Sequence, residues 1–269
     1  MPRLRVTRNS ATGAAAGGVA GPSYDADATT YFAAVEAADG QSLESGVKTA
    51  INDFIVGCKA DGVWSAIKAS CILAGARTLA GALVPLVGTA PTNFNFVSGD
   101  YNRKTGLVGN GTTKKLRTGL NYNQTQQNNT HFSVYADTLN RQSNKVLIGS
   151  FTEGGIALQG GQLLVFHVHN RDYLQGYDPD HFNNSAGFIG ATRNNSAEIT
   201  RRRLAQNLTF AAVSAAPVNQ TINVFGYYNT DAFYYAGRLS FYSIGDNIDL
   251  ALLDTRLTAL MSALATAIP

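Results

Sequence analysis

The sequence predicts a mainly β protein, an antiparallel β-sandwich of the jelly-roll type with a short helical module before it and a single helix after it. From Thr130 onward, short segments that alternate apolar and polar residues follow one another, separated by glycine-containing or polar turns. No helical pattern lies between these segments, as a parallel sheet with crossover helices would require. Apolar residues at helical spacing occur only toward the two ends of the chain.

The composition fits a β-rich surface or particle protein. Only 14% of the 269 residues are charged and 27 are glycine. The net charge of +3 is too small to predict a nucleic-acid partner or a charged membrane surface. No apolar run approaches the ~20 residues that span a bilayer, so membrane insertion is not expected. Cys58 and Cys71 both fall in the helical part, which favours buried thiols over a disulfide framework.

Residues 1–22 are linker-like, with arginines followed by alanine and glycine. The stretch lacks the hydrophobic segment of a signal peptide, so we expect a protein made in the cytoplasm with a flexible or partner-bound arm. The alternation of Arg3, Leu4, Arg5 and Val6 would let this arm add as a strand to the sheet edge of a neighbouring subunit.

Residues 23–91 form the predicted helical module, which we expect to pack on the sandwich. One helix is expected from Thr29 to Ala38, capped by Thr29 or Thr30, and a second from about Leu43 to Lys59. Apolar residues between Val63 and Ile72 suggest another helical turn or two. Glycines and prolines break the apolar stretch from Leu79 to Pro91, which predicts an irregular connection.

Residues 92–245 form the predicted sandwich, which opens with Gly106 to Leu120 (GLVGNGTTKKLRTGL). Its Gly-Asn-Gly predicts a tight turn before a strand, and the absence of a following helix excludes a phosphate-binding loop. We expect Lys114, Lys115 and Arg117 to face solvent or a neighbouring subunit. In the next strand, HFSVYA, the alternation places Phe132, Val134 and Ala136 on one face and His131, Ser133 and Tyr135 on the other.

The last predicted element, within residues 246–269, is a helix capped by Asp246 or Asn247. Its apolar stripe has two open interpretations: it docks on the protein's own core, or it forms a short coiled-coil seam that drives oligomerisation. The stripe consists of Leu250, Leu253, Leu257, Leu260, Leu264 and Ala267.

Candidate ligands for metal ions are few. His167 and His169 project from the same face of a predicted strand, and Asp178 and Asp180 lie in a loop that offers oxygen ligands to calcium. Neither group supplies a complete ligand set, so we expect no metal and no cofactor. The basic run Arg201 to Arg203 is expected at a solvated hairpin tip or a subunit contact, since successive arginines of a strand point to opposite faces.

No catalytic motif is present, and we do not expect an enzyme. The sequence has no Gly-x-Ser-x-Gly turn, no paired carboxylates on one strand face, and no dinucleotide or Walker glycine pattern after a strand. A carbohydrate-active sandwich is the enzymatic alternative. It would have to use one of the scattered acids Glu153, Asp172, Asp178, Asp180 or Glu198.

Aromatic residues crowd the last strands and supply the strongest binding candidates. Alternation puts Phe233, Tyr235, Leu239 and Phe241 on one face, which we expect to be core. The other face would stack sugars or meet a partner, with ordinary cross-strand pairing as the alternative. The candidate binding residues are Tyr227, Tyr228, Tyr234, Arg238 and Tyr242.

From about Thr29 onward the chain resembles proteins widespread in tailed-phage genomes that carry a concanavalin A-like, LamG-type jelly roll. The matching stretches are YFAAVEAADG, the V-x-x-A-I-N-x-F-I-x-G-x-K-A-D-G-V-W run from Val47 to Trp64, NFVSGDYNRKTGLVGNGTTKKLRTG, THFSVYA, GFIGATR and the run from Arg238 to Leu264. The resemblance implies a non-enzymatic component of the virion.

Within the particle, the resemblance favours a tail fibre, spike or baseplate component whose lectin-like domain contacts host surface glycans. A capsid decoration or head-fibre protein anchored by residues 1–22 is the alternative. The expected partners are other virion proteins and further copies of this chain, with a homotrimer suggested by analogy with symmetric phage fibres.

Overall fold

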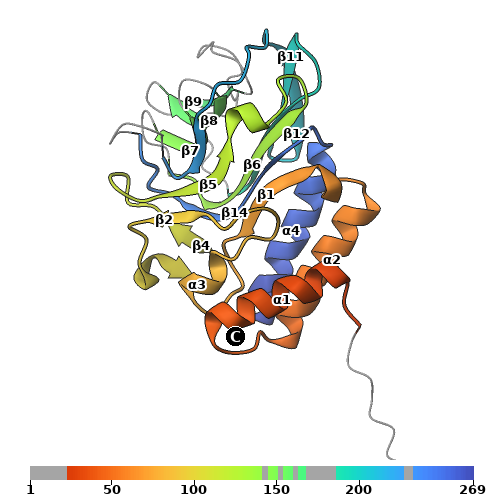
Figure 1. Cartoon of the computed structure of the whole chain (residues 1–269), viewed down its shortest axis with the longest axis vertical. Coiled ribbons are helices and arrows are strands. Elements are labelled where there is room, and N and C mark those ends of the chain that lie inside the picture. Colours follow the sequence, from red (N-terminus) through yellow and green to blue (C-terminus); the bar gives the residue numbers. More distant parts are fainter. Residues whose placement is uncertain (1–22, 141–144, 151–153, 160–162, 168–185, 227–232) are drawn as a thin grey trace, which may run out of the picture.

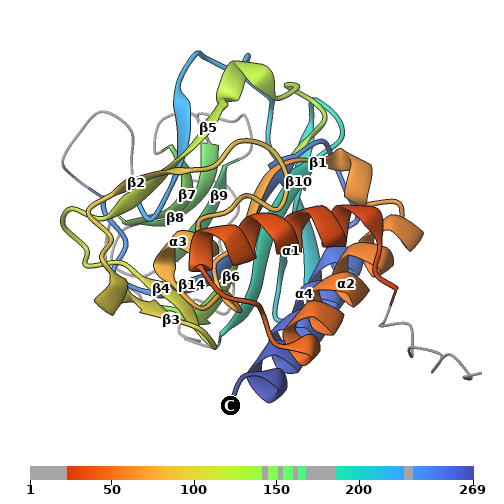
Figure 2. The same cartoon turned by 60° about the horizontal axis from the view of Figure 1, so that its bottom comes forward.

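The computed structural model describes residues 23–140, 145–150, 154–159, 163–167, 186–226 and 233–269. They form three layers (Figures 1 and 2). Helices cover one face of a first sheet, and a second sheet packs against the other face of the first. The helices come from both ends of the described chain and lie side by side.

The helical layer consists of α1 (Ala26–Asp39), α2 (Ser45–Ala60) and α4 (Leu250–Ala267), while α3 (Leu79–Ala82) is one short turn. The expected caps at Thr29 or Thr30 and at Asp246 or Asn247 are wrong. Asp25 caps α1 by accepting from the Asp27 amide at 2.9 Å, and Asp249 caps α4 by accepting from the Ala251 amide at 2.8 Å. Carboxylates compete better than threonine for helix N-termini because the helix dipole also favours negative charge there.

The first sheet, sheet A, has the strand order β12-β11-β10-β6-β14-β4-β3, with β1 also paired to β14. Its strands are β1 (Ile67–Ile72), β3 (Tyr101–Asn102), β4 (Gly106–Val108), β6 (Thr130–Thr138), β10 (Gly187–Arg193), β11 (Glu198–Arg203), β12 (Gln206–Ala211) and β14 (Arg238–Gly245).

Sheet B has the order β2-β5-β13-β7-β8-β9. Its strands are β2 (Thr92–Phe94), β5 (Lys115–Asn121), β7 (Lys145–Ser150), β8 (Gly154–Gln159), β9 (Leu163–His167) and β13 (Thr221–Val224). All pairings in both sheets are antiparallel, and the chain passes repeatedly from one sheet to the other. This confirms the predicted antiparallel β-sandwich with helices at both ends.

Two apolar cores hold the layers together. Between the sheets lies the first, to which β6 contributes Phe132, Val134 and Ala136 as its alternation predicts. The second lies between sheet A and the helices. The leucines of the predicted stripe on α4 are at most 2% exposed, which confirms that this helix docks on the protein's own core. By length and composition alone α4 is apolar enough to cross a membrane, with a mean hydropathy of 1.3.

Two elements differ from the prediction. Trp64–Ala66 forms a helical turn as expected, but Ile67 to Ile72 is the strand β1. It is covered by the sandwich core on one face and by the helices on the other, so residues on both faces are buried and the two-residue alternation of a half-buried strand is lost. The strand β12 is not predicted, because half of its residues are polar and five of the six are exposed.

The alternation along β14 is also interrupted. Leu239 and Tyr242 belong to the sandwich core, whereas Phe241 packs against the helices. The pairing of β14 with β6 shifts register between Leu239 and Phe241, which marks a bulge. The prediction that Leu239 and Phe241 share a face is therefore wrong, because the extra residue reverses the two faces.

The glycine-rich turn links β4 of sheet A to β5 of sheet B. A side chain at Gly109 would place its Cβ 1.9 Å from the carbonyl oxygen of Tyr235, so only glycine fits there. The Asn110 side chain accepts from the backbone amides of Thr112, Thr113 and Lys114 and shapes the turn.

The expectation that the basic residues of this stretch face only solvent or a subunit is wrong. Lys114 forms an ion pair with Asp100. Lys115 lies over the rings of Phe94 and Tyr234, at 5.6 and 5.4 Å. Arg117 lies 5.1 Å from the Phe94 ring centre. Lys115 and Arg117 pack over these rings because their long apolar stems and positive ends suit aromatic faces.

Candidate functional site

The predicted aromatic face does not lie on the surface of the described structure. Tyr242 is 0% exposed and donates to the Cys71 sulfur at 3.5 Å, and Tyr234 is 4% exposed. Arg238 donates to the carbonyl oxygen of Gly106 at 2.6 Å. The physical reason is the bulge in β14, which turns Tyr242 into the sandwich core. Tyr227 and Tyr228 lie outside the described residues.

The other predicted ligands are not brought together within the described residues. His167 ends β9 opposite Gly155 in β8. Within the described ranges, no three His, Cys, Asp or Glu side chains gather as metal ligands would. Outside the described residues lie His169, Asp178 and Asp180, the acids Glu153 and Asp172, and the arm residues Arg3, Leu4, Arg5 and Val6.

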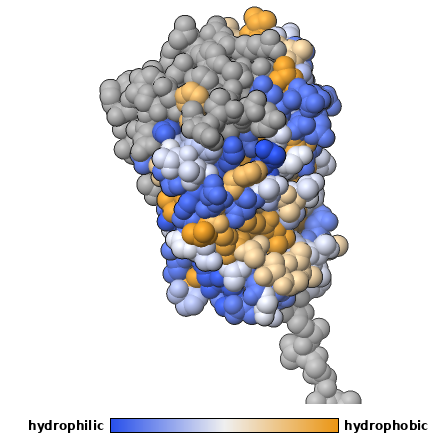
Figure 3. All heavy atoms as spheres, turned by 60° about the vertical axis from the view of Figure 1, so that its left-hand side comes forward, coloured by the Kyte–Doolittle hydropathy of each residue, from blue (hydrophilic) through white to orange (hydrophobic). Residues whose placement is uncertain are grey.

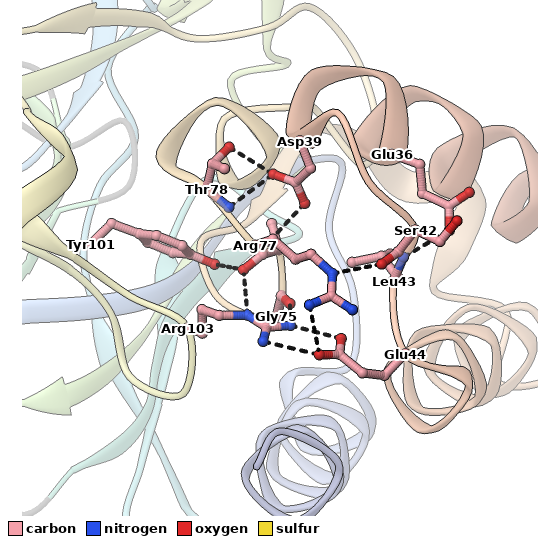
Figure 4. A network of polar contacts seen from close by, with 11 residues as sticks. Glu36, Asp39, Ser42, Leu43, Glu44, Gly75, Arg77, Thr78, Tyr101 and Arg103 are labelled. Carbon is pink, nitrogen blue, oxygen red and sulfur yellow. Dashed lines mark hydrogen bonds and ion pairs between the residues drawn. The ribbon is translucent and has the colours of Figure 1, made fainter.

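A polar network joins the helical layer to the β3–β4 hairpin (Figure 4). Arg103 at the hairpin tip makes two hydrogen bonds with the Glu44 carboxylate, at 3.0 and 2.7 Å. The same guanidinium donates to the backbone carbonyl oxygens of Gly75 and Ala76. The Arg103 guanidinium holds the pKa of Glu44 below its ordinary value.

Beside it, Asp39 accepts from the backbone amides of Arg77 and Thr78, at 2.7 and 2.8 Å, and from the Thr78 hydroxyl (Figure 4). A side chain on Gly81 would come 2.2 Å from the Asp39 carboxylate. The hydrogen bonds described for Arg103 and Asp39 therefore all go to other groups of the protein itself. We interpret this network as a structural clamp.

The basic run on β11 is buried, so the expected solvated hairpin tip is wrong. Arg201, Arg202 and Arg203 are 4, 9 and 2% exposed. By the alternation of a strand, Arg201 and Arg203 lie on the sandwich side with Ile199, and Arg202 lies on the helix side. The tip of the β11–β12 hairpin is instead made by Leu204 and Ala205, both with positive φ.

On the helix side, Arg202 donates through Nε to Asp254 of α4 at 2.7 Å and through Nη1 to Asn207 at 3.0 Å. The two side chains of the ion pair are 11 and 12% exposed. Arg202 in β11 and Asp254 in α4 are 52 residues apart in the sequence. This pair forms the polar centre of a groove between α4 and the outer face of sheet A.

The groove has a volume of about 680 Å³, a size typical of sites for small ligands. One wall is α4, and the other is made by β6, β10 and the β11–β12 turn. Its lining residues are Tyr135, Ala186, Gly187, Phe188, Arg202, Leu204, Ala205, Asp254, Thr255, Thr258, Ala259 and Ser262.

Hydroxyl groups surround the ion pair in the groove. Thr258 donates to the second Asp254 oxygen at 3.3 Å and forms a hydrogen bond with Tyr135. Burial raises the pKa of the Tyr135 hydroxyl above its ordinary value, and the Thr258 hydrogen bond opposes this shift. Thr255 and Ser262 add two exposed hydroxyls. The groove thus offers donors, acceptors and an aromatic ring.

A buried polar row lies on β6 and its neighbour β14. His131 contacts the Ser243 hydroxyl at 2.8 Å and the Asp246 carbonyl oxygen at 2.6 Å, and Ser243 contacts Ser133 at 2.9 Å. This resembles the serine–histidine pair of a hydrolase, but all three side chains are 0% exposed. Burial lowers the pKa of His131 to about 4. A substrate has no access to this serine, so we interpret the row as structural.

The face on the left of Figure 1 is brought forward in Figure 3. An apolar band is exposed at the level of α3 and β4, with hydrophilic areas above and below it. The groove beside α4 combines paired charges, hydroxyls and an aromatic ring, so it is the better-equipped site.

Comparison with known protein families found no family model that matches the chain, and no curated protein matches it. Solved structures do resemble it. Domain 4 of an extracellular arabinanase from Geobacillus stearothermophilus, solved with arabinotriose, is 10% identical with a TM-score of 0.42, over 63% of this chain and 82% of that one.

The binding domain of botulinum neurotoxin serotype D is 11% identical with a TM-score of 0.47, over 76% of this chain and 52% of that one. A Trypanosoma rangeli sialidase is 10% identical with a TM-score of 0.48, over 85% of this chain and 37% of that one. The chain thus spans about half or less of these two proteins. No TM-score here reaches 0.5, and the fold class follows from the sheet topology.

The residues of the groove were not predicted as a site. The sequence predicts Tyr135 only on the polar face of its strand, and Arg202 only as part of a basic run. Asp254 carries the clearest signal in retrospect, because it is an acid next to the leucine stripe of a buried helix. No local pattern pairs it with Arg202, since the strand and the helix meet only in the folded chain.

Proposed function

We propose that this protein is a non-enzymatic structural component of a tailed-phage particle, in a tail fibre, spike or baseplate, and that its groove beside α4 holds a host surface glycan. The observation that carries the glycan part is the composition of the groove: a paired arginine and carboxylate ringed by hydroxyls and a tyrosine. The resemblance of the chain to phage proteins supports its place in a virion.

The proposed ligand follows from the chemistry of the lining. A sugar presents neighbouring hydroxyls that donate and accept hydrogen bonds. The Arg202 guanidinium is a donor and the Asp254 carboxylate an acceptor, and the two groups are 2.7 Å apart. Because the two charges compensate each other, the site favours a neutral ligand over an anion. The ring of Tyr135 supplies apolar area for a sugar face, and Thr255 and Thr258 supply further polar contacts.

The test is a glycan array followed by adsorption to host cells, using the purified full chain. The variant Thr255→Trp fills the groove, and Thr266→Trp on the same helix is its matched control. Both threonines are exposed, and each hydroxyl donates to the carbonyl oxygen four residues earlier, at 2.8 and 3.0 Å. We expect Thr255→Trp to abolish glycan binding and Thr266→Trp to retain it. Equal binding by both variants would refute the groove as the site.

The virion part of the proposal has its own experiment. Purified particles of the source phage are expected to contain this chain, visible as density at the tail. For the alternative, a capsid decoration or head-fibre protein, residues 1–22 are the proposed anchor, and a chain lacking them is expected to keep its thermal unfolding temperature but to be absent from the particles. Normal incorporation of the truncated chain would refute the anchoring role, and absence of the full chain from particles would refute the virion role.

A further inference from the structure

The strand β12 is an outer edge of sheet A. It pairs with β11 through six consecutive residue pairs, from Glu198 with Ala211 to Arg203 with Gln206, without a register shift. It ends the order of strands in the sheet as described. Its residues are exposed apart from the half-buried Phe210. The strand thus presents a straight, accessible row of backbone donors and acceptors.

Edge strands of monomeric proteins often carry a charge, a proline or a bulge that prevents pairing with another chain, and β12 carries none of these three. The sequence QNLTFA contains no charged residue and no proline, and its pairing contains no bulge. Leu208 on this strand is 41% exposed, and Val213 just beyond it is 79% exposed. A strand added beside β12 would bring side chains next to Leu208.

Two of the other described edges are too short to act as pairing templates. At the far side of sheet A, β3 has two residues, and at one side of sheet B, β2 has three. Strands this short offer too few backbone groups for stable pairing with another chain. The edge at the other side of sheet B, β9, has five residues and pairs with β8 without a register shift. With six residues, β12 is the longest of these four edges.

We propose that two copies of this chain associate through β12, antiparallel about a twofold axis, so that sheet A continues from one copy into the other. A twofold axis brings the strand against its own sequence, and any charge near the centre would then face itself. The uncharged QNLTFA strand meets this requirement. The charged residues of the neighbouring strand, Arg201 to Arg203, are buried one strand further in.

The alternation of side chains limits the register of this pairing. A continuous sheet keeps inward residues opposite inward ones, so the axis passes beside either Leu208 or Thr209. In the first case Leu208 lies opposite its own copy, and in the second Thr209 does. In both registers the two Thr209 side chains are direct or diagonal neighbours.

The test compares Thr209→Lys with Thr200→Lys in size-exclusion chromatography with light scattering. Thr200 lies directly opposite Thr209 on β11, and their hydroxyls bond each other at 2.7 Å, so each variant loses the same contact. We expect a dimer for the wild type and Thr200→Lys, and for Thr209→Lys a dimer dissociation constant at least about tenfold higher. A monomeric wild type, or equal dissociation constants for both variants, would overturn the proposal.

Cysteine cross-linking gives an independent measurement. The only cysteines, Cys58 and Cys71, are buried, so an introduced cysteine is the accessible one. Under mild oxidation we expect a covalent dimer from Leu208→Cys or Thr209→Cys, whichever residue lies at the axis, and none from Thr200→Cys. Cross-linking of neither edge variant, or of all three variants alike, would overturn the proposal.

Discussion

Two arginine–carboxylate pairs connect helices to strands in this protein, and they are built differently. In the clamp of Figure 4, Arg103 bonds both oxygens of Glu44 and two backbone carbonyls. In the groove, Arg202 bonds one oxygen of Asp254 and the Asn207 amide oxygen, and hydroxyls line the adjoining space. In the clamp, the arginine bonds only groups of the protein itself, whereas in the groove the ion pair lines an open cavity.

The difference separates a stabilising role from a binding role for the same chemical pair. Bidentate bonding that also satisfies backbone carbonyls leaves no capacity for a ligand. The Arg202–Asp254 pair has a single charged contact and lies next to a volume of about 680 Å³. Its remaining hydrogen-bond donors and acceptors can therefore bond an incoming hydroxyl. The comparison predicts large stability effects and no binding effect at the clamp, and the reverse at the groove.

The largest effect is expected from Arg103→Leu. It removes four hydrogen bonds and leaves the Glu44 charge with Arg77 as its cationic neighbour, so we expect a loss of about 3–4 kcal/mol in the free energy of unfolding. Urea denaturation measures this loss. Arg103→Lys is the control that keeps the charge but not the fork, and it should recover part of the stability. Glycan binding by the folded fraction should not change.

Acid is the next test, because His131 is a buried titratable group outside the clamp. Burial lowers its pKa to about 4, below the ordinary 6.5 of the unfolded chain. The unfolded state therefore binds the proton first, and stability falls by up to about 3 kcal/mol between pH 6.5 and pH 4. The charged groups beside it, Asp246 and Lys68, form an ion pair with each other. In denaturation curves across this range, His131→Gln should flatten the slope; an unchanged slope would contradict the assignment.

A smaller stability effect is expected from Asp254→Asn in the groove. The amide keeps an oxygen for Arg202 but loses the charge, so we expect about 1–2 kcal/mol of destabilisation and a loss of glycan binding of at least about tenfold. Thermal unfolding and the glycan array measure the two effects. If the variant unfolds more readily than Arg103→Leu while its binding is intact, the roles given to the two pairs are reversed.

The smallest effect is expected from Thr258→Val. The valine keeps the shape but removes the contacts with Asp254 and Tyr135, at an exposed position where stability should change by less than about 1 kcal/mol. Glycan affinity should fall by about threefold to tenfold. Isothermal titration measures the change, and Thr266→Val on the same helix is its control. Equal affinities for the two variants would remove Thr258 from the site.

Much of the fold was predictable because its signals are local. The faces of β6 follow from alternation, and the docking face of α4 follows from leucines at three- and four-residue spacing. The failures occur where the local signal is ambiguous. Ile67 to Ile72 is covered on both faces, so its buried residues do not alternate. A bulge near Ser240 reverses the alternation that assigned Tyr242 to the surface.

By itself, the sequence determined the helices and strands that bury one face and expose the other, because one-sided burial makes apolar residues recur at a regular spacing along the chain. It also determined the tight turn at Asn110, where the side chain bonds its own backbone. Tertiary structure alone decided which distant groups meet. Arg103 joins Glu44 across 59 residues and Arg202 joins Asp254 across 52. Such contacts depend on how layers stack in space, and no short-range pattern encodes them.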